Sequence, residues 1–327
     1  MLMHSRYDDV FHAKLKFPYD RTLQHEIEHH RKAQGGLLFI DRVMKALGVV
    51  KGSSSSVIDL SVGSQLTALE GRMYPPKSEN ALRQLHQLFC ETAMAVHHKQ
   101  SLLYYIMLDF DTVASQSSES QKFAADVGMP VNYQTFMKGL WLMDRQRYQE
   151  ALEFVTHPSL TPDFADDIIT TLVRYAPDHD YSLVLSYFYT VRPSLKSASA
   201  LELLFDAMVQ ADATEALLFS RTHPQHTRQQ LFRRWVRINL KQGRRGEQPS
   251  QRDRLAFLPL DSVEEKWFEQ YLTVGEGKNL PKAKDTLLAR QIACDRFSDV
   301  SEEQKVDERW AAVVEGIKRG VGATHSW

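Results

Sequence analysis

The chain has 327 residues, of which 43% are hydrophobic and 25% are charged, the balance of a folded protein rather than a disordered one. Its 40 lysine and arginine residues nearly cancel its 41 acidic residues, and the net charge of −1 excludes a global attraction to nucleic acid or anionic lipid. The two cysteines make no disulfide framework, and no apolar run approaches the roughly 18 residues of a membrane helix, so we expect a soluble intracellular protein without direct membrane insertion.

The first motif along the chain is HEIEHH at residues 25–30, which contains the H-E-x-x-H spacing of zinc hydrolases. Two imidazoles four residues apart share one helix face, and the glutamate between them can activate a zinc-bound water. The extended motif needs Gly at 32 and His at 35, but the chain has Lys32 and Gly35. Because Leu23 and Ile27 mark the inward stripe, the motif histidines face the other way, and we predict no metal site.

The middle of the chain repeats the helical period, and short proline-marked stops separate the helices. Apolar stripes comprise Tyr133, Phe136, Met137, Leu140 and Trp141; Ala165, Ile168, Ile169 and Leu172; and Leu201, Leu204, Phe205, Met208 and Val209. The stops lie at Pro130, Pro158, Pro162, Pro177, Pro193 and Pro224, and the predicted N-caps are Asp163, Asp178 and Ser197. Short links favour antiparallel neighbours, so we predict an all-α fold, an irregular α-helical solenoid of antiparallel helix pairs with about 13 to 17 helices.

Polar stretches interrupt this pattern in three places. KGSSSS at residues 51–56 predicts a flexible joint or a helix entry, and Ser115–Ser120 predicts a polar loop. GRRGEQPSQRDR at residues 243–254 predicts a linker before a charged helical tail.

Other catalytic signals are incomplete. Gly275–Asn279 contains Gly-Lys, but a phosphate-binding P-loop needs Gly at 272 and Ser or Thr at 279, where the chain has Leu and Asn. Asp109-Phe110-Asp111 ends an apolar helix, where acidic residues usually begin a loop. No nucleophile elbow appears. We therefore predict no catalytic residue, no cofactor and no metal, and do not expect an enzyme.

One surface feature rises above background. Eight basic residues and no acidic residue lie between Arg221 and Arg245. A helix over 228–245 places its apolar residues on one side and gathers basic residues on the other, so this basic stripe is a candidate contact for phosphates or an acidic partner. Its candidate residues are Arg233, Arg234, Arg237, Lys241, Arg244 and Arg245. An ordinary solvated face gives the same pattern, and the absence of interleaved aromatics argues against base stacking.

Several segments, in this order and spacing, resemble the ELYS-type nuclear pore assembly domain. They are LLFIDRVMKALGV (37–49), YPP (74–76), KQSLLYYIMLDFD (99–111), FAADVGMPVNYQTFMKGLWLMDRQRYQEALEFVTHPSL (123–160) and LVLSYFYTVRPSL (183–195). The resemblance covers residues 17–245. It divides the chain into an N-terminal arm (1–16), an ELYS-like helical domain (17–245) and a helical, partly flexible C-terminal tail (246–327).

The resemblance implies a non-enzymatic structural nucleoporin that attaches to the Y-shaped scaffold complex of the nuclear pore, with a part in pore assembly and in protein and mRNA transport. The implied partners are a β-propeller subunit and the large short-arm subunit, and the implied location is the nuclear envelope. The chain lacks the Gly-Arg-Pro core of an AT hook and has no room for the N-terminal β-propeller of large animal members, so it is similar to the short fungal form. The alternative is a nucleic-acid- or nucleosome-binding helical protein that uses the basic stripe, with at most weak, non-specific binding.

Overall fold

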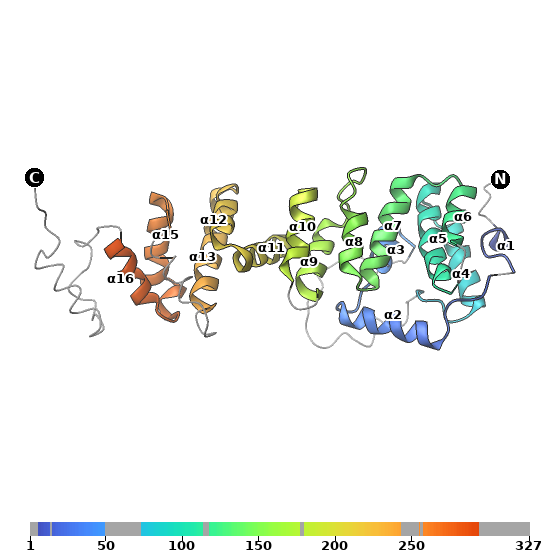
Figure 1. The fold of residues 1–327 in the computed structure, drawn as a ribbon, viewed down its shortest axis with the longest axis horizontal. Coiled ribbons are helices and arrows are strands. Elements are labelled where there is room, and N and C mark those ends of the chain that lie inside the picture. The colour runs from blue at the N-terminus through green and yellow to red at the C-terminus, as the bar shows by residue number, and fades with distance from the viewer. Residues whose placement is uncertain are drawn as a thin grey trace, which may run out of the picture. The chain divides into compact units, whose positions relative to one another are not determined.

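The computed structural model describes residues 6–13, 15–49, 73–113, 118–176, 180–242, 255 and 258–293. Within these ranges all regular secondary structure is helical, which confirms the all-α prediction, and the 15 α-helices fall inside the predicted range (Figure 1). The elements are α1 (Tyr7–Val10), α2 (Arg21–Ala33), α3 (Phe39–Ala46), α4 (Glu79–Glu91), α5 (Val96–Asp111), α6 (Glu119–Asp126), α7 (Val131–Asp144), α8 (Tyr148–Val155), α9 (Ala165–Tyr175), α10 (Tyr181–Val191), α11 (Ala198–Ala211), α12 (Ala213–Arg221), α13 (Gln225–Gln242), α15 (Ser262–Thr273), the 3-10 helix η3 (Glu276–Asn279) and α16 (Ala283–Ala293). The chain forms two compact units, Met1–Ala207 and Met208–Trp327.

In the first unit consecutive helices pack as pairs, α5 with α6, α7 with α8, and α9 with α10. Their axes alternate in direction, as the ribbon in Figure 1 shows, which is the predicted arrangement of a helical solenoid. Gly139 allows α7 and α8 to approach closely, because a Cβ at this position would lie 2.6 Å from Cγ1 of Val155. Across this unit α7 also packs on α3 and α5.

The predicted apolar stripes form the core. In α7 the side chains of Met137, Leu140 and Trp141 are buried, and the two earlier members of that stripe are half-buried. All four stripe residues of α9 are buried, as are the last four of the stripe in α11. The helical period therefore identified the inward face of these three helices correctly, because burying that stripe provides most of a helix's stability.

Of the three predicted N-caps, the structure confirms one and contradicts one. Ser197 caps α11, since its Oγ accepts a hydrogen bond from the backbone N–H of Ala200 at 3.5 Å. The N-cap prediction for Asp163 is wrong, because the N-cap of α9 is Phe164, whose φ of 57° is left-handed. The cap of α10 is Asp180, which accepts from the N–H of Ser182, while Asp178 lies outside the described residues.

The predicted polar loop at 115–120 is shorter than expected. Helix α6 already begins at Glu119, and Asp111 accepts hydrogen bonds from the N–H and the hydroxyl of Ser120. Residues 115–117, the KGSSSS segment and the predicted linker at 243–254 lie outside the described residues.

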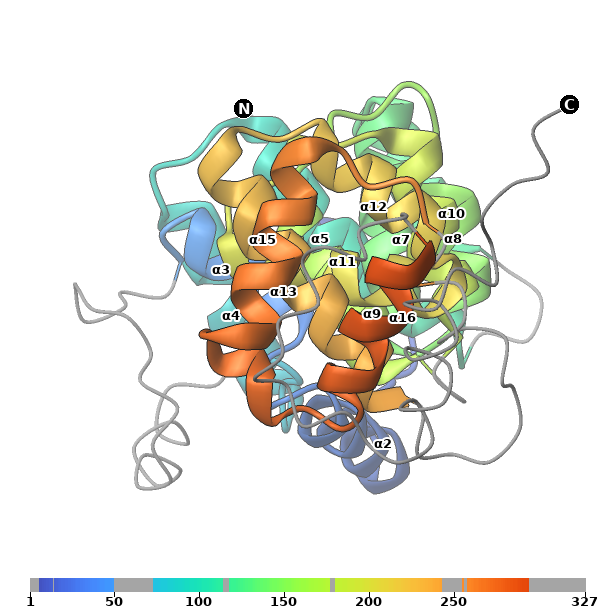
Figure 2. The ribbon, with the colours of Figure 1, turned by 90° about the vertical axis from the view of Figure 1, so that its left-hand side faces the viewer.

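In the second unit α12 packs with α13, α13 with α15, and α15 with α16. Helices α13 and α15 lie side by side in both ribbon views (Figures 1 and 2). Across their contact the ring centroids of Phe232 and Trp267 lie 6.0 Å apart, and Phe232, Trp235 and Phe268 are buried within the second unit. Among the described helices, none has both the length and the apolar character to cross a lipid bilayer.

Candidate interaction surfaces

The predicted basic stripe lies on α13. The apolar side of this helix is buried at Leu231, Phe232, Trp235 and Val236, as the sequence pattern requires. On the other side Arg233 and Lys241 are exposed, while Arg234 and Arg237 are half-buried. Arg244 and Arg245 lie outside the described residues. The structure thus brings four of the six candidate residues onto one helix.

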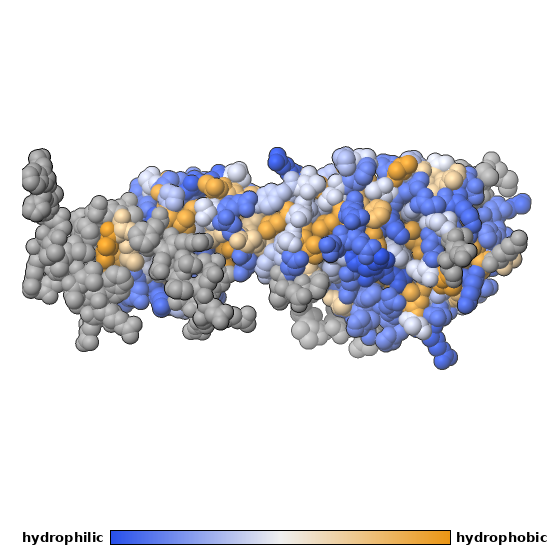
Figure 3. Space-filling view, viewed as in Figure 1, coloured by the Kyte–Doolittle hydropathy of each residue, from blue (hydrophilic) through white to orange (hydrophobic). Residues whose placement is uncertain are grey.

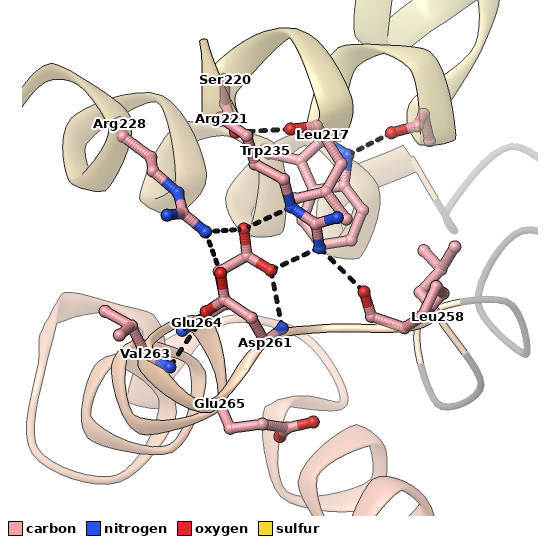
Figure 4. Close-up of polar contacts among 12 residues, drawn as sticks. Leu217, Ser220, Arg221, Arg228, Trp235, Leu258, Asp261, Val263, Glu264 and Glu265 are labelled. Carbon is pink, nitrogen blue, oxygen red and sulfur yellow. Dashed lines mark hydrogen bonds and ion pairs between the residues drawn. The ribbon is translucent and has the colours of Figure 1, made fainter. Parts of the chain in front are cut away.

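Two basic residues from the same run, Arg221 and Arg228, are engaged within the protein (Figure 4). Glu264, in the first turn of α15, is buried, and its Oε2 lies 2.7 Å from a guanidinium nitrogen of Arg221. Its Oε1 lies 2.5 Å from Arg228, which also pairs with Asp261, the N-cap of α15. Burial alone would raise the pKa of Glu264, but the hydrogen bonds from the two arginines hold this pKa below its ordinary value. We call these four residues the arginine–carboxylate cluster.

Helix α15, which packs on the helix of the basic stripe, carries acidic residues. Helix α15 carries three glutamates, Glu264, Glu265 and Glu269, and runs alongside α13. Arg233 and Arg237 both act on the hydroxyl of Tyr271: burial raises its pKa, and the two positive charges oppose that shift. Two of these glutamates are already engaged, Glu264 with Arg221 and Arg228 and Glu265 with Arg290, so they do not pair with the exposed Arg233 and Lys241.

The H-E-x-x-H motif lies on α2. Asp20 caps this helix by accepting from the N–H of Leu23, and Ile27 is buried while His25 and His29 are exposed. Within the described ranges, no group of three His, Cys, Asp or Glu side chains is placed to hold a metal ion. The orientation of the two histidines agrees with the helical stripe drawn from Leu23 and Ile27.

Asp109, which the sequence places at the end of an apolar helix, is the centre of a buried polar network. Its Oδ2 accepts from the hydroxyls of Tyr19 and Tyr74, each at 2.7 Å. Its Oδ1 accepts from Nε1 of Trp141 at 2.8 Å and from Arg145 at 2.6 Å. Burial and the Asp109 charge raise the pKa values of Tyr19 and Tyr74 well above the ordinary value of a tyrosine, so both hydroxyls keep their protons and donate. The YPP, LDFD and WLMDR segments therefore supply side chains to this buried network, which serves the fold.

A second buried carboxylate, Asp144, holds the start of α3. Its Oδ1 accepts from the N–H of Phe39 at 2.6 Å, and its Oδ2 accepts from the N–H of Ile40 at 3.0 Å. The hydroxyl of Tyr105 donates to Oδ2 at 2.7 Å. An anion in this position satisfies helix N–H groups that have no partner within the helix. Burial raises the pKa of Asp144 to about 7, against the effect of these three hydrogen bonds.

The candidate surface that the sequence analysis missed is α10. Residues 181–191 contain no charged side chain, yet of these 11 residues only Val184 and Tyr187 are buried. Tyr189 is 39% exposed, and Leu183, Leu185 and Phe188 are half-buried. In Figure 3 the surface over α10 is pale to orange, with little of the blue that marks the most hydrophilic residues. Uncharged surfaces rich in aromatic residues are typical of the centre of protein–protein interfaces. The absence of charge over eleven residues was the available signal.

Comparison with known proteins gives a family for this architecture. Residues 37–275 match the model of a family described as "ELYS: Nuclear pore complex assembly". The match extends past residue 245 and includes α15. A curated relative, the "Uncharacterized protein ely5" of Schizosaccharomyces pombe, is 27% identical over 180 residues. That alignment covers 55% of this chain and 51% of the relative, so the chain spans about half the length of the curated relative it matches.

Proposed function

The chain belongs to the ELYS family of nuclear pore complex assembly proteins, and we propose that within it the chain is a non-enzymatic scaffold that attaches to the Y-shaped nucleoporin complex. Family membership implies a role in pore assembly and a place at the nuclear pore complex. The proposed partners are a β-propeller subunit and the large short-arm subunit, with a consequent part in protein and mRNA transport. These finer points come from the family resemblance.

The observation that carries the proposal is the uncharged surface of α10, where Leu185, Phe188 and Tyr189 are at least partly exposed beside serine and threonine side chains. Stable scaffold contacts bury at least ~1,200 Å² in total, and their energy is concentrated in a few aromatic and arginine side chains. Leu185 and Tyr189 lie 100° and 140° around the helix from the buried Val184, at ~100° per residue. They are therefore the side chains through which this face would contact a partner.

The absence of an enzymatic role is part of the same proposal. The conspicuous acidic residues of the described chain have structural partners: Asp109 binds two tyrosines, a tryptophan and an arginine, and Asp144 binds a helix N-terminus. Glu264 is held by two arginines. Carboxylates whose acceptor positions are filled by protein donors serve the fold, and this supports a scaffold over a hydrolase.

The test compares the full chain with a Leu185→Glu, Tyr189→Glu double variant in size-exclusion chromatography with a reconstituted short-arm subassembly of the Y complex. We expect the wild type to co-elute and the variant to lose at least tenfold in affinity, because two buried carboxylates without partners oppose association. Val131→Glu is the matched control, since Val131 is 70% exposed on α7. Unchanged binding by a folded double variant would remove α10 from the interface.

A further inference from the structure

The N-terminal segment of the chain packs against helices α4 and α5 of the first unit. Residues 7–11, YDDVF, form α1 and one following residue. They lie against α4 at Arg83 and His86 and against α5 at Phe110, and the following residue, His12, lies next to Glu119 of α6. We call these four contacting residues the arm site.

Aromatic side chains make the main contacts. The ring of Phe11 lies 5.4 Å from that of Phe110 and 6.1 Å from that of His86, measured between centroids. Tyr7 meets His86 edge-on at 5.8 Å, and the Arg83 guanidinium stacks over the Tyr7 ring at 4.0 Å. Val10 and Phe11 are 4% and 5% exposed, so the i+3 and i+4 positions of the segment are its anchors.

Acidic residues of the segment face the solvent side of the same contact. Asp8 lies 3.5 Å from Arg83, and both side chains are largely exposed. Just beyond the segment, His12 lies 3.7 Å from Glu119. Exposed ion pairs of this kind add little affinity, but they select the sign of charge that a ligand carries.

Two observations separate the segment from the domain on which it lies. A helix of four residues is not stable by itself, because nucleation costs more than one turn returns, so α1 is helical only through its contacts. The family match begins at residue 37, after the segment, whereas the arm-site residues fall within the matched range. The segment therefore has the properties of a ligand bound in cis.

We propose that the arm site is a binding site for a short helical peptide with aromatic residues at positions i and i+4 and acidic residues between them. Residues 7–11 are its built-in ligand. A segment of the same pattern in a partner protein competes with them for the site. The segment is tethered at roughly millimolar effective concentration, so it occupies the site until it is displaced or weakened.

The experiment measures binding of a fluorescent peptide with the sequence of residues 4–14 by fluorescence anisotropy. The full chain is compared with a Tyr7→Ala, Phe11→Ala variant, in which the tethered segment loses its two ring contacts. We expect the variant to bind the peptide and the wild type to bind it about 1,000-fold more weakly, the ratio of a millimolar effective concentration to a micromolar dissociation constant. A peptide carrying Phe11→Ala is the ligand control and should not bind.

Variants of the site itself complete the test. Adding Arg83→Glu to the released variant should weaken peptide binding roughly three- to tenfold, since it removes an exposed cation–π contact and a screened ion pair. Arg147→Glu, at a similarly exposed arginine paired with Glu150, should leave peptide binding unchanged. The proposal is overturned if the released variant keeps the wild-type helix content yet binds no peptide. It is also overturned if that variant loses helix content outside α1, because the segment is then part of the core.

Discussion

Replacing Asp109 by Asn removes the charge from a buried side chain that accepts four hydrogen bonds, while preserving its size. Arg145, whose side chain is 7% exposed, then loses its buried partner. The new amide also places N–H groups opposite donors, since Tyr19, Tyr74 and Trp141 all donate to the native carboxylate. Removing one partner of a buried ion pair costs about 3–5 kcal/mol, and the remaining contact of Arg145 with the half-exposed Glu26 offsets little of it.

That loss is a large share of the roughly 5–15 kcal/mol that stabilises a typical domain. At about 2–4 °C per kcal/mol for a unit of this size, the midpoint of thermal unfolding should fall by roughly 6–20 °C. The assay is urea and thermal unfolding of the full chain followed by circular dichroism at 222 nm. Asp126→Asn is the control, because Asp126 is exposed on α6, and surface substitutions usually stay within about 0.5 kcal/mol. A loss below about 1 kcal/mol for Asp109→Asn would refute the network's importance.

Three further predictions follow from the carboxylates and from the second unit. Because the pKa of Asp144 is raised to about 7, this carboxyl holds its proton more tightly in the folded state than in the unfolded chain. The stability of the protein should therefore fall as pH rises from about 4 to 7, by at most ~1.4 kcal/mol per pH unit from this group. Asp144→Asn should flatten this pH dependence in urea titrations, and an unchanged slope would contradict the assignment. A chain ending at residue 245 should unfold at lower temperature than one ending at residue 293. The shorter chain loses the α15 carboxylates and the burial of Phe268, which is worth about 1.5–3 kcal/mol. Equal unfolding midpoints in calorimetry would place α15 outside the cooperative unit. Finally, the chain should bind duplex DNA weakly and without sequence preference, with an affinity that falls steeply between about 50 and 200 mM salt. The double substitution Arg233→Glu, Lys241→Glu should abolish this binding. Tight, salt-resistant binding to one sequence would favour the nucleic-acid alternative.

The fold class was predictable because the helical period survives in sequence wherever a helix buries a single stripe. The stripe of α9, for example, needed no tertiary information, since all four of its residues point to the core. Sequence did not predict the partners of Asp109, which lie 90 and 35 residues before it and 32 and 36 residues after it. Hydrogen bonds over such separations have no local periodicity, so these acids were indistinguishable from the start of a loop.

The candidate surfaces show the same limit. The sequence pattern predicted a basic side of α13, whose role as a contact surface stays a prediction, but it did not reveal that Arg228 pairs with residues 33 and 36 positions later. Helix α15 was assigned to the tail because a polar stretch precedes it, whereas its carboxylates bind α12 and α13. The boundary at 245 stays a prediction, which the truncation comparison above tests. Helix α10 was overlooked because an apolar run suggests core, and only the fold shows how much of it is exposed.

The measurement that tests the central claim most directly is the mass of the complex formed between the full chain and a reconstituted short-arm subassembly of the Y complex. Size-exclusion chromatography with multi-angle light scattering at micromolar concentration gives that mass without labels. The scaffold account predicts a single peak with the mass of the subassembly plus one copy of the chain, lost in the Leu185→Glu, Tyr189→Glu variant. A helical, correctly folded chain that elutes apart from the subassembly would contradict it.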